Sequence, residues 1–538
     1  MSAPAPESDR IDARRLLIVF SVMLAVLLEI IDTSIVNTAL PAMMGNLGAT
    51  LDEIDWVITG YIISNVVVIP LTGWLAATFG RKRYFVTSIL LFTFASLMCG
   101  LAQSANALVF WRVVQGLGGG ALLSTSQAIM IETFPARQQG VGQAIFGVGA
   151  MIGPSLGPTL GGWLTDNYSW HWIFLINVPL GLLAAFLCAT TLRKPVVEPK
   201  RADRVDWTGI ALLIVGVGAL QTVLERGHKD DWFESSTIVW LTAAALIGGV
   251  AFVVRELTTD HPVVDLRVLR HRALAVGCAL GILMGIGLYG SIFLLPVYTQ
   301  SLLGWTAWDS GLAVLPSSVM TALMMGVAGR LVYKVGPRAL LGTGMVVMIV
   351  ALWKMSHWTL ASTYDHLFWP QAMRGIAMGL MFVPVSIVTL RSLPPADLPQ
   401  GAGLYNLFRQ LGGSFGVALL TTVLDRRAEV HRFQLSEHAG RLDPIAAQQL
   451  KEAAAGLVGR GLDPQAAERA AAAMIDGRVG AAASLHAFQD AYIYIALLFL
   501  IGLPLLVFVS NRVPGMDAPA TAPPRKDEPT RDAVAAHA

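Results

Sequence analysis

Apolar residues run along this chain in long blocks separated by short polar stretches, and this pattern predicts an all-α protein of membrane-spanning helices. A helix needs about 20 mostly apolar residues to cross a bilayer. Fourteen segments meet that requirement: 16–37, 56–76, 84–103, 107–131, 139–164, 172–192, 207–225, 236–254, 273–296, 309–332, 338–356, 367–390, 400–424 and 488–510. The first has no small-residue cleavage site after it, so we interpret it as a retained span and not a signal peptide.

One of these segments carries an unusual pattern of small residues. Gly149, Gly153, Gly157 and Gly161 recur every fourth position, with Pro154 and Pro158 between them. Glycine and proline weaken a helix in water, but in a bilayer the backbone satisfies itself and a glycine stripe lets another helix approach closely. The two prolines predict a bend. We expect either tight static packing or a rocking contact between two helical bundles.

The basic residues give the predicted orientation. Lys and Arg cluster on one side of the spans, whereas the short loops on the other side carry only Arg226, Lys229 and Lys354. The positive-inside rule therefore places both termini in the cytoplasm. The long segment 425–487 then lies outside the membrane, and its Ala-rich, charge-mixed composition predicts a pair of helices there.

Composition agrees with a multi-pass membrane protein. Charged residues make up 14% of the chain, against about 25% in soluble proteins. The three cysteines all lie in apolar segments, so the sequence predicts neither a disulfide framework nor a thiolate metal site. No GxxxxGK[ST], HExxH or CxxC motif is present, so we expect no ATP coupling within the chain, no metal site, no cofactor and no enzymatic activity.

An internal repeat divides the chain. GWLAATFGRK, which begins at Gly73, recurs as GRLVYKVGPR, which begins at Gly329. Parallel repeats of this size imply two six-helix bundles around a central site that works by alternating access. The predicted organisation is a cytoplasmic tail 1–15, a first bundle 16–192, a linker 193–206, two extra spans 207–255, a linker 256–272, a second bundle 273–510 containing the periplasmic loop 425–487, and a disordered cytoplasmic tail 511–538.

Several segments resemble one transporter family. They are EIIDTSIVNTALP (29–41), GWLAATFGRKR (73–83), WRVVQGLGGG (111–120) and the glycine-rich 147–162. They resemble the first-helix, loop, fourth-helix and antiporter motifs of the major facilitator superfamily, specifically its fourteen-span drug:proton antiporters, the EmrB/QacA group. WHWIFLINVP (170–179) and WPQAMRGIAMG (369–379) resemble the EmrB branch more closely. One departure is Ala77, where the loop motif usually has an acidic residue, so the resemblance does not extend to the charge relay commonly assigned to that loop.

Three ionisable residues of the first bundle are candidates for proton coupling. Glu29 and Asp32 share a helix face, which Asn37 continues, and Asp32 lies ~6 Å from the outer edge of the hydrocarbon. Arg112 reaches a similar depth of ~8 Å, so an Asp32–Arg112 or a Glu29–Arg112 contact is feasible. Separating such a pair would change the proton affinity of the carboxylate, and antiport requires such a change. The alternative is a structural ion pair. We favour Asp32, which matches the family motif, as the main coupling group.

The second bundle offers candidates for the substrate cavity but no matching acid. Arg409 shares a face with Tyr405 and Asn406, and either engages anionic substrates or donates hydrogen bonds between helices. Met381 and Phe382 belong to a Met-rich stretch that either forms an adaptable apolar surface or is plain core. At the loop motif, Gly73 and Gly80 accompany Arg81, which we expect to anchor at lipid headgroups or to latch the cytoplasmic face.

These observations predict a proton-driven exporter of hydrophobic or amphipathic compounds in a bacterial cytoplasmic membrane, with the proton as coupling ion. The resemblance to the EmrB branch implies a periplasmic adaptor (EmrA-like) and an outer-membrane channel (TolC-like) as partners, with the 425–487 loop as a contact or only a lid. We also expect the protein to contact membrane lipids and small drugs, and we expect no binding of nucleic acid. The alternatives are a dedicated exporter of a fatty acid or endogenous metabolite, and a transport-inactive sensor.

Overall fold

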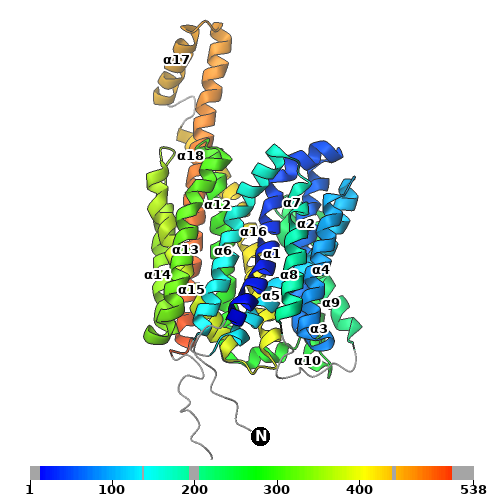
Figure 1. Cartoon of the computed structure of the whole chain (residues 1–538). Coiled ribbons are helices and arrows are strands. Elements are labelled where there is room, and N and C mark those ends of the chain that lie inside the picture. The colour runs from blue at the N-terminus through cyan, green and yellow to red at the C-terminus, as the bar shows by residue number, and fades with distance from the viewer. Residues whose placement is uncertain (1–12, 136–137, 193–204, 439–443, 512–538) are drawn as a thin grey trace, which may run out of the picture.

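The computed structural model describes residues 13–135, 138–192, 205–438 and 444–511, and these residues form helices and connecting turns without a β-strand. Within these described residues, thirteen helical stretches are long and apolar enough to cross a membrane. Helix α6 (Gln139–Asn167), 29 residues long, lies beside α1 (Ala13–Leu47) and α13 (Ala307–Val335) and completes the fourteen expected spans (Figure 1). Most of the predicted tails and the 193–206 linker lie outside the described residues.

The first half of the chain forms one bundle of six spans, drawn from blue to cyan in Figure 1. Its second span is built of three consecutive elements, and its sixth of two. Besides α1 and α6, the elements are α2 (Leu51–Val68), η1 (Ile69–Leu71), α3 (Thr72–Phe79), α4 (Arg81–Gly100), α5 (Ala105–Thr133), α7 (Trp172–Leu175) and α8 (Asn177–Thr191).

Two further spans separate this bundle from the next. Helix α9 (Trp207–Arg226) and helix α10 (Ser236–Thr258) pack together where Gly216 meets Gly248 and Gly249, and the short turn η2 (Trp232–Glu234) connects them. A Cβ atom on Gly216 would lie 2.7 Å from the Gly249 nitrogen, so only glycine permits this approach. Helix α9 also contacts α2 of the first bundle and α16 of the second.

The second half forms the other bundle, drawn from green to red. Its first span contains two π-helical turns, the second of which directly follows the segment with Pro296, whose ring removes a backbone hydrogen bond. The elements besides α13 are η3 (Leu266–Arg270), α11 (Arg272–Gly285), η4 (Ile286–Gly290), α12 (Ser291–Val297), η5 (Tyr298–Leu302), α14 (Pro337–Met355), α15 (Tyr364–Arg391), α16 (Leu398–His438), α17 (Pro444–Val458), α18 (Pro464–Gly502) and η6 (Leu503–Phe508).

The segment 425–487 is helical and projects from one end of the molecule. Helices α16 and α18 continue beyond the bundle, and α17 packs against α18, which gives the hairpin at the top of Figure 1. Asp490 of α18 ties the base of this hairpin, because it accepts hydrogen bonds from Arg427 at 2.6 Å and from His431 at 2.8 Å. We call this end of the molecule the hairpin end.

The repeated loop motif marks the opposite end, which we call the Gly80 end. Gly80 and Gly336 occupy equivalent repeat positions, and both adopt the left-handed φ region, at 82° and 93°. A side chain is rarely tolerated there, so each glycine permits the sharp turn from one span into the next. The repeat read from the sequence therefore corresponds to the same backbone turn in both bundles.

The two bundles meet closely at the Gly80 end. A Cβ atom on Gly73 of α3 would lie 2.8 Å from Cα of Gln400 in α16. A Cβ atom on its repeat equivalent, Gly329 of α13, would lie 2.6 Å from the carbonyl oxygen of Gly140 in α6. The Tyr333 hydroxyl also accepts a hydrogen bond from the Gly140 nitrogen at 2.8 Å. The same repeat position thus makes a close contact between the bundles twice, once between α3 and α16 and once between α13 and α6.

Candidate functional site

Asp32 and Arg112 form a fully buried ion pair between α1 and α5. Arg112 Nη1 donates to Asp32 Oδ2 at 2.6 Å, and both residues are 0% exposed. Burying a charge is costly unless an opposite charge and hydrogen bonds compensate it. Of the two contacts that the sequence allowed for Arg112, the structure makes the one with Asp32.

Residues of α5 itself and of two neighbouring helices, α2 and α8, complete the coordination of this pair. Asp32 Oδ1 accepts a hydrogen bond from Gln115 of α5 at 2.9 Å and another from Asn177 of α8 at 2.8 Å. The Arg112 Nε donates to the Val57 carbonyl of α2 at 2.9 Å, and its guanidinium lies 4.1 Å from the ring centre of Tyr61. Every oxygen of the carboxylate is therefore engaged, in a network that joins α1, α2, α5 and α8.

Sequence reasoning missed Gln115, Asn177 and Ser96, which accepts from Asn177 at 3.1 Å. Two of them were nevertheless visible. Gln115 lies three residues after Arg112 and hence on the same helix face. Asn177 is the polar residue within WHWIFLINVP.

Glu29 occupies a separate environment, one helical turn from Asp32. Asn65 of α2 donates to Glu29 Oε1 at 3.1 Å, whereas Glu29 Oε2 is buried without a protein partner. Arg409 of α16 lies within electrostatic reach of this carboxylate but makes no ion pair with it. Glu29 therefore bonds within the first bundle and lies within electrostatic reach of a cation of the second, whereas the bonds of Asp32 all stay within the first. Asn37, predicted to continue the same face, is exposed.

A polar cluster connects the two bundles near Arg409. Asn406 of α16 donates to Gln127 Oε1 of α5 at 2.7 Å, and Gln127 Nε2 donates to Ser386 of α15 at 3.3 Å. Arg409 donates to Asn406 Oδ1 at 3.2 Å. The structure thus brings the predicted Asn406 and Arg409 together. Gln127 and Ser386 were missed, although a glutamine inside an apolar span is a signal that a partner is needed.

The predicted apolar and aromatic residues of the substrate cavity, Tyr405, Phe382 and Met381, have different surroundings in the structure. Tyr405 is fully buried, and its hydroxyl has no protein partner. Phe382 of α15 lies where the bundles meet, with its ring 6.3 Å from that of Phe146 in α6. Met381 points the other way, because a Cβ on Gly344 of α14 would lie 2.6 Å from its Cγ. Met381 is therefore a core residue, which is the alternative that the sequence left open.

The glycine stripe of α6 packs within its own bundle. Cβ atoms at Gly149, Gly153, Gly157 and Gly161 would collide with α1, at Met23, Ile30, Ser34 and Ile35. The expectation that this stripe contacts the other bundle is wrong for this conformation. The spacing defines a face but not its partner, and Gly140 and Gly147 approach the second bundle instead. Helix α6 runs through Pro154 and Pro158, whose side chains lie outside the described part of the structure.

Arg81 of the loop motif is engaged within the first bundle. Its guanidinium forms an ion pair with Glu132, near the end of α5. We predicted that Arg81 anchors at lipid headgroups or latches the two bundles together. The ion pair with Glu132 is neither of these, because it lies within one bundle. Ala77 stands where the motif usually has an acidic residue, and the carboxylate that pairs with Arg81 is that of Glu132 in α5.

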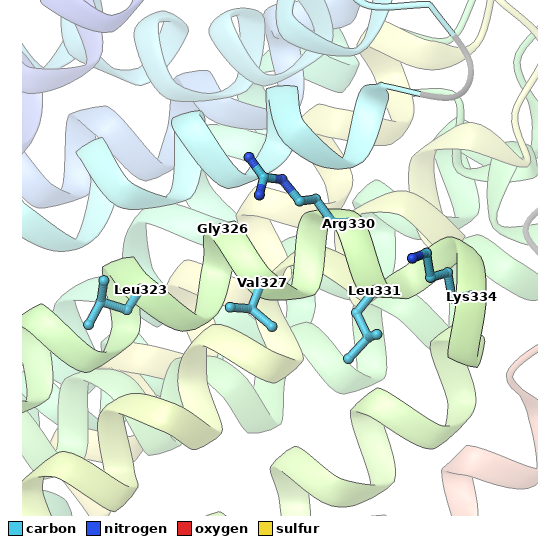
Figure 2. Close-up of a pocket in the computed structure, with 6 residues that line it drawn as sticks. All are labelled: Leu323, Gly326, Val327, Arg330, Leu331 and Lys334. Atoms are coloured by element: carbon cyan, nitrogen blue, oxygen red, sulfur yellow. The ribbon is translucent and has the colours of Figure 1, made fainter.

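A surface groove lies away from these clusters. Its volume is about 490 Å³, and Figure 2 shows its lining along one face of α13, with the Arg330 side chain directed towards α6. The lining residues are Leu323, Gly326, Val327, Arg330, Leu331 and Lys334. None of the predicted site residues lines it, so we place the candidate site at the buried clusters and not in this groove. Within the described residues, no group of three His, Cys, Asp or Glu side chains could hold a metal ion.

Comparisons with known proteins find relatives over most of the chain. The chain is 35% identical over 435 residues to Multidrug export protein EmrB of Escherichia coli (strain K12), covering 81% of this chain and 85% of that protein. It is 33% identical over 446 residues to Fatty acid resistance protein FarB of Neisseria gonorrhoeae, covering 83% and 87%.

A solved structure shares the fold. The human organic anion transporter MFSD10 (TETRAN) superimposes with a TM-score of 0.60 at 16% identity, covering 91% of this chain and 99% of that one. The sequence profile of the Major Facilitator Superfamily matches residues 22–417. This chain is a multi-pass membrane transporter that belongs to the Major Facilitator Superfamily.

Proposed function

We propose that the protein is a proton-coupled exporter of hydrophobic or amphipathic compounds. The observation that carries the proposal is the buried Asp32–Arg112 pair. The relatives of the chain, among them proteins named multidrug export protein, support it. The membrane is the bacterial cytoplasmic membrane, both termini are cytoplasmic, and the hairpin end faces outwards. The proposed units are the bundles 16–192 and 273–510 with the extra spans 207–255 between them.

In this mechanism the proton and the conformational change are linked through Asp32. While Asp32 is ionised, Arg112, Gln115 and Asn177 hold it and so bind α1 to α5 and α8. Protonation removes the charge that Arg112 compensates and weakens the contact. The helices can then rearrange, and the substrate leaves at the hairpin end as the proton enters. Glu29 and Arg409, which belong to different bundles and lie within electrostatic reach of each other, provide polar groups of both signs to the substrate cavity.

The test is proton movement in liposomes that contain the purified protein. A pH gradient is imposed, and ethidium and an acidic uncoupler are offered separately to wild type, Asp32→Asn and Glu29→Gln. We expect a substrate-triggered proton flux that Asp32→Asn abolishes, while Glu29→Gln retains flux with altered substrate preference. Unchanged flux in Asp32→Asn would move the coupling site to Glu29 or elsewhere.

A dedicated fatty-acid exporter is the second candidate, and the similarity to FarB favours it. A narrow response, to long-chain fatty acids but not to ethidium, would identify it. Substrate binding without flux would instead indicate a transport-inactive sensor.

A periplasmic adaptor and an outer-membrane channel are the proposed partners, with the hairpin as the contact. Co-purification of the adaptor with a protein lacking residues 430–484 would remove the hairpin from that assembly.

A further inference from the structure

Arg374 of α15 is a buried cation for which the proposed mechanism has no use. It lies inside the second bundle and is 3% exposed. Its Nη1 donates to Ser291 Oγ of α12 at 2.8 Å, and its Nε has no protein acceptor. Among the described residues, no carboxylate lies within ion-pair distance of it, whereas the equally buried Arg112 of the first bundle pairs with Asp32.

This arrangement leaves a positive charge uncompensated. A guanidinium remains charged in proteins and has five donors but no acceptor. Burial of such a group without an opposite charge is strongly unfavourable. Ser291 contributes only a neutral oxygen, and its own proton is donated to the Gly287 carbonyl.

The surroundings of Arg374 provide more unpaired polar groups. Tyr492 of α18 is close enough to interact electrostatically with Arg374, and its hydroxyl has no protein partner. Gln371 lies one helical turn earlier on α15, hence on the same side, and neither end of its amide is bonded. Tyr492 and Gln371 are each 1% exposed. A ligand that accepts hydrogen bonds and carries negative charge complements all three residues.

We propose that Arg374, Gln371 and Tyr492 bind a small monovalent anion of halide size inside the second bundle. The anion supplies the negative charge that the first bundle obtains from Asp32. It is small because the residues around it, Ser291 included, are at most 3% exposed, which leaves no opening for an organic substrate. Its role is to hold α12, α15 and α18 together, independently of proton coupling.

The first test measures thermal unfolding of the purified full-length protein in sodium chloride and in sodium gluconate at equal ionic strength. We expect chloride to raise the Tm in a saturable manner, because a ligand at ten times its Kd raises the ratio of folded to unfolded protein about 11-fold. Arg374→Gln should unfold at the same Tm in both salts. The control is Arg338→Gln, since Arg338 also donates to uncharged oxygens, the Val507 and Val509 carbonyls, but is exposed. It should keep the full chloride response.

A second measurement on the wild type keeps the proposal testable if Arg374→Gln does not fold. Crystals grown in bromide should give an anomalous peak within hydrogen-bond distance of the Arg374 guanidinium. Equal Tm values for the wild type in the two salts would overturn the proposal. So would a chloride response that persists in Arg374→Gln, or an anomalous map without a peak at Arg374. Because neither readout involves transport, failure here is distinguishable from failure of the proposed function.

Discussion

Asn406 of α16 donates a hydrogen bond to Gln127 of α5 at 2.7 Å, and the two residues belong to different bundles. They are 1% and 0% exposed, so water does not replace the bond while the bundles are together. Transport by alternating access requires the bundles to move relative to each other. The Asn406–Gln127 bond therefore stabilises the present conformation against the one in which these helices separate.

Replacing Gln127 by leucine should shift that equilibrium. Gln127→Leu removes two hydrogen bonds between the bundles, the one from Asn406 and the one to Ser386. A net hydrogen bond contributes about 1 kcal/mol, so we expect a change of roughly fivefold to 30-fold in the ratio of the two conformations. Asn406 keeps its bond to the Ala402 carbonyl, so the protein should remain folded. Spin labels at Phe79 and Val335, exposed repeat equivalents at the Gly80 end, report the change as a larger population at the longer distance. Ser124→Ala, which removes an unpaired hydroxyl of α5, should leave the distances unchanged. An unaltered distribution in Gln127→Leu would contradict the prediction.

Substitution by alanine should have different effects on thermal stability at two adjacent glycines of α6, Gly161 and Gly162. A Cβ on Gly161 would lie 2.7 Å from the Ile35 carbonyl oxygen, whereas nothing lies within 4 Å of a Cβ on Gly162. Overpacking typically costs about 1–3 kcal/mol, so Gly161→Ala should lower the Tm. Gly162→Ala should leave it unchanged or raise it, because alanine favours the helix by about 1 kcal/mol. Equal Tm values for the two variants, measured by size-exclusion chromatography after heating, would show that α1 and α6 are not in close contact here.

The spans were predictable, and the partner of Arg112 could be narrowed to Asp32 or Glu29, because both depend on quantities that a sequence contains. Hydrocarbon thickness fixes the length of a span, and the helical rise fixes the depth of a residue within it. Two opposite charges at the same depth in neighbouring spans are therefore expected to meet.

The other partners depend on how each helix is rotated and on which helix it touches. Periodicity alone does not determine either, so Asn177 and Glu132 could not be assigned to Asp32 and Arg81. The stripe of Gly149 to Gly161 shows the same limit. Its spacing correctly predicted a close contact, and the identity of the contacting helix came only from the fold.

Arg112→Lys should test whether geometry or charge alone is needed at the buried pair. Arginine donates in three directions, to Asp32, Gln115 and the Val57 carbonyl, and a lysine ammonium cannot reproduce this planar arrangement. We expect the folded protein to persist, because a cation still faces Asp32, while substrate-driven proton flux falls at least ~10-fold, which corresponds to the loss of about 1.4 kcal/mol. Arg112→Gln should in addition lower the Tm. Wild-type flux in Arg112→Lys would mean that charge alone is sufficient.

The ion pair at the start of α9 should make stability depend on pH in acid. Burial raises the pKa of Asp206, but the hydrogen bonds from Arg255 at 2.9 Å and from the Gly209 nitrogen at 3.0 Å outweigh it and hold the pKa below its usual value. The stabilisation is therefore complete above the unfolded pKa of about 3.9 and is lost as the pH falls through the lower folded value. Asp206→Asn keeps the helix cap, since Asn caps as well as Asp, and removes only the charge. Because Arg255 is largely exposed and solvent screens the pair, we expect Asp206→Asn to lower the Tm only slightly at pH 7. The Tm difference between wild type and Asp206→Asn should shrink towards pH 3.

The control is the other partner of the pair. Arg255→Met should lower the Tm by a similar amount, and the variant with both substitutions should lower it only a little further. A Tm difference that grows as the pH falls, or fully additive losses, would show that the two residues do not act as a pair.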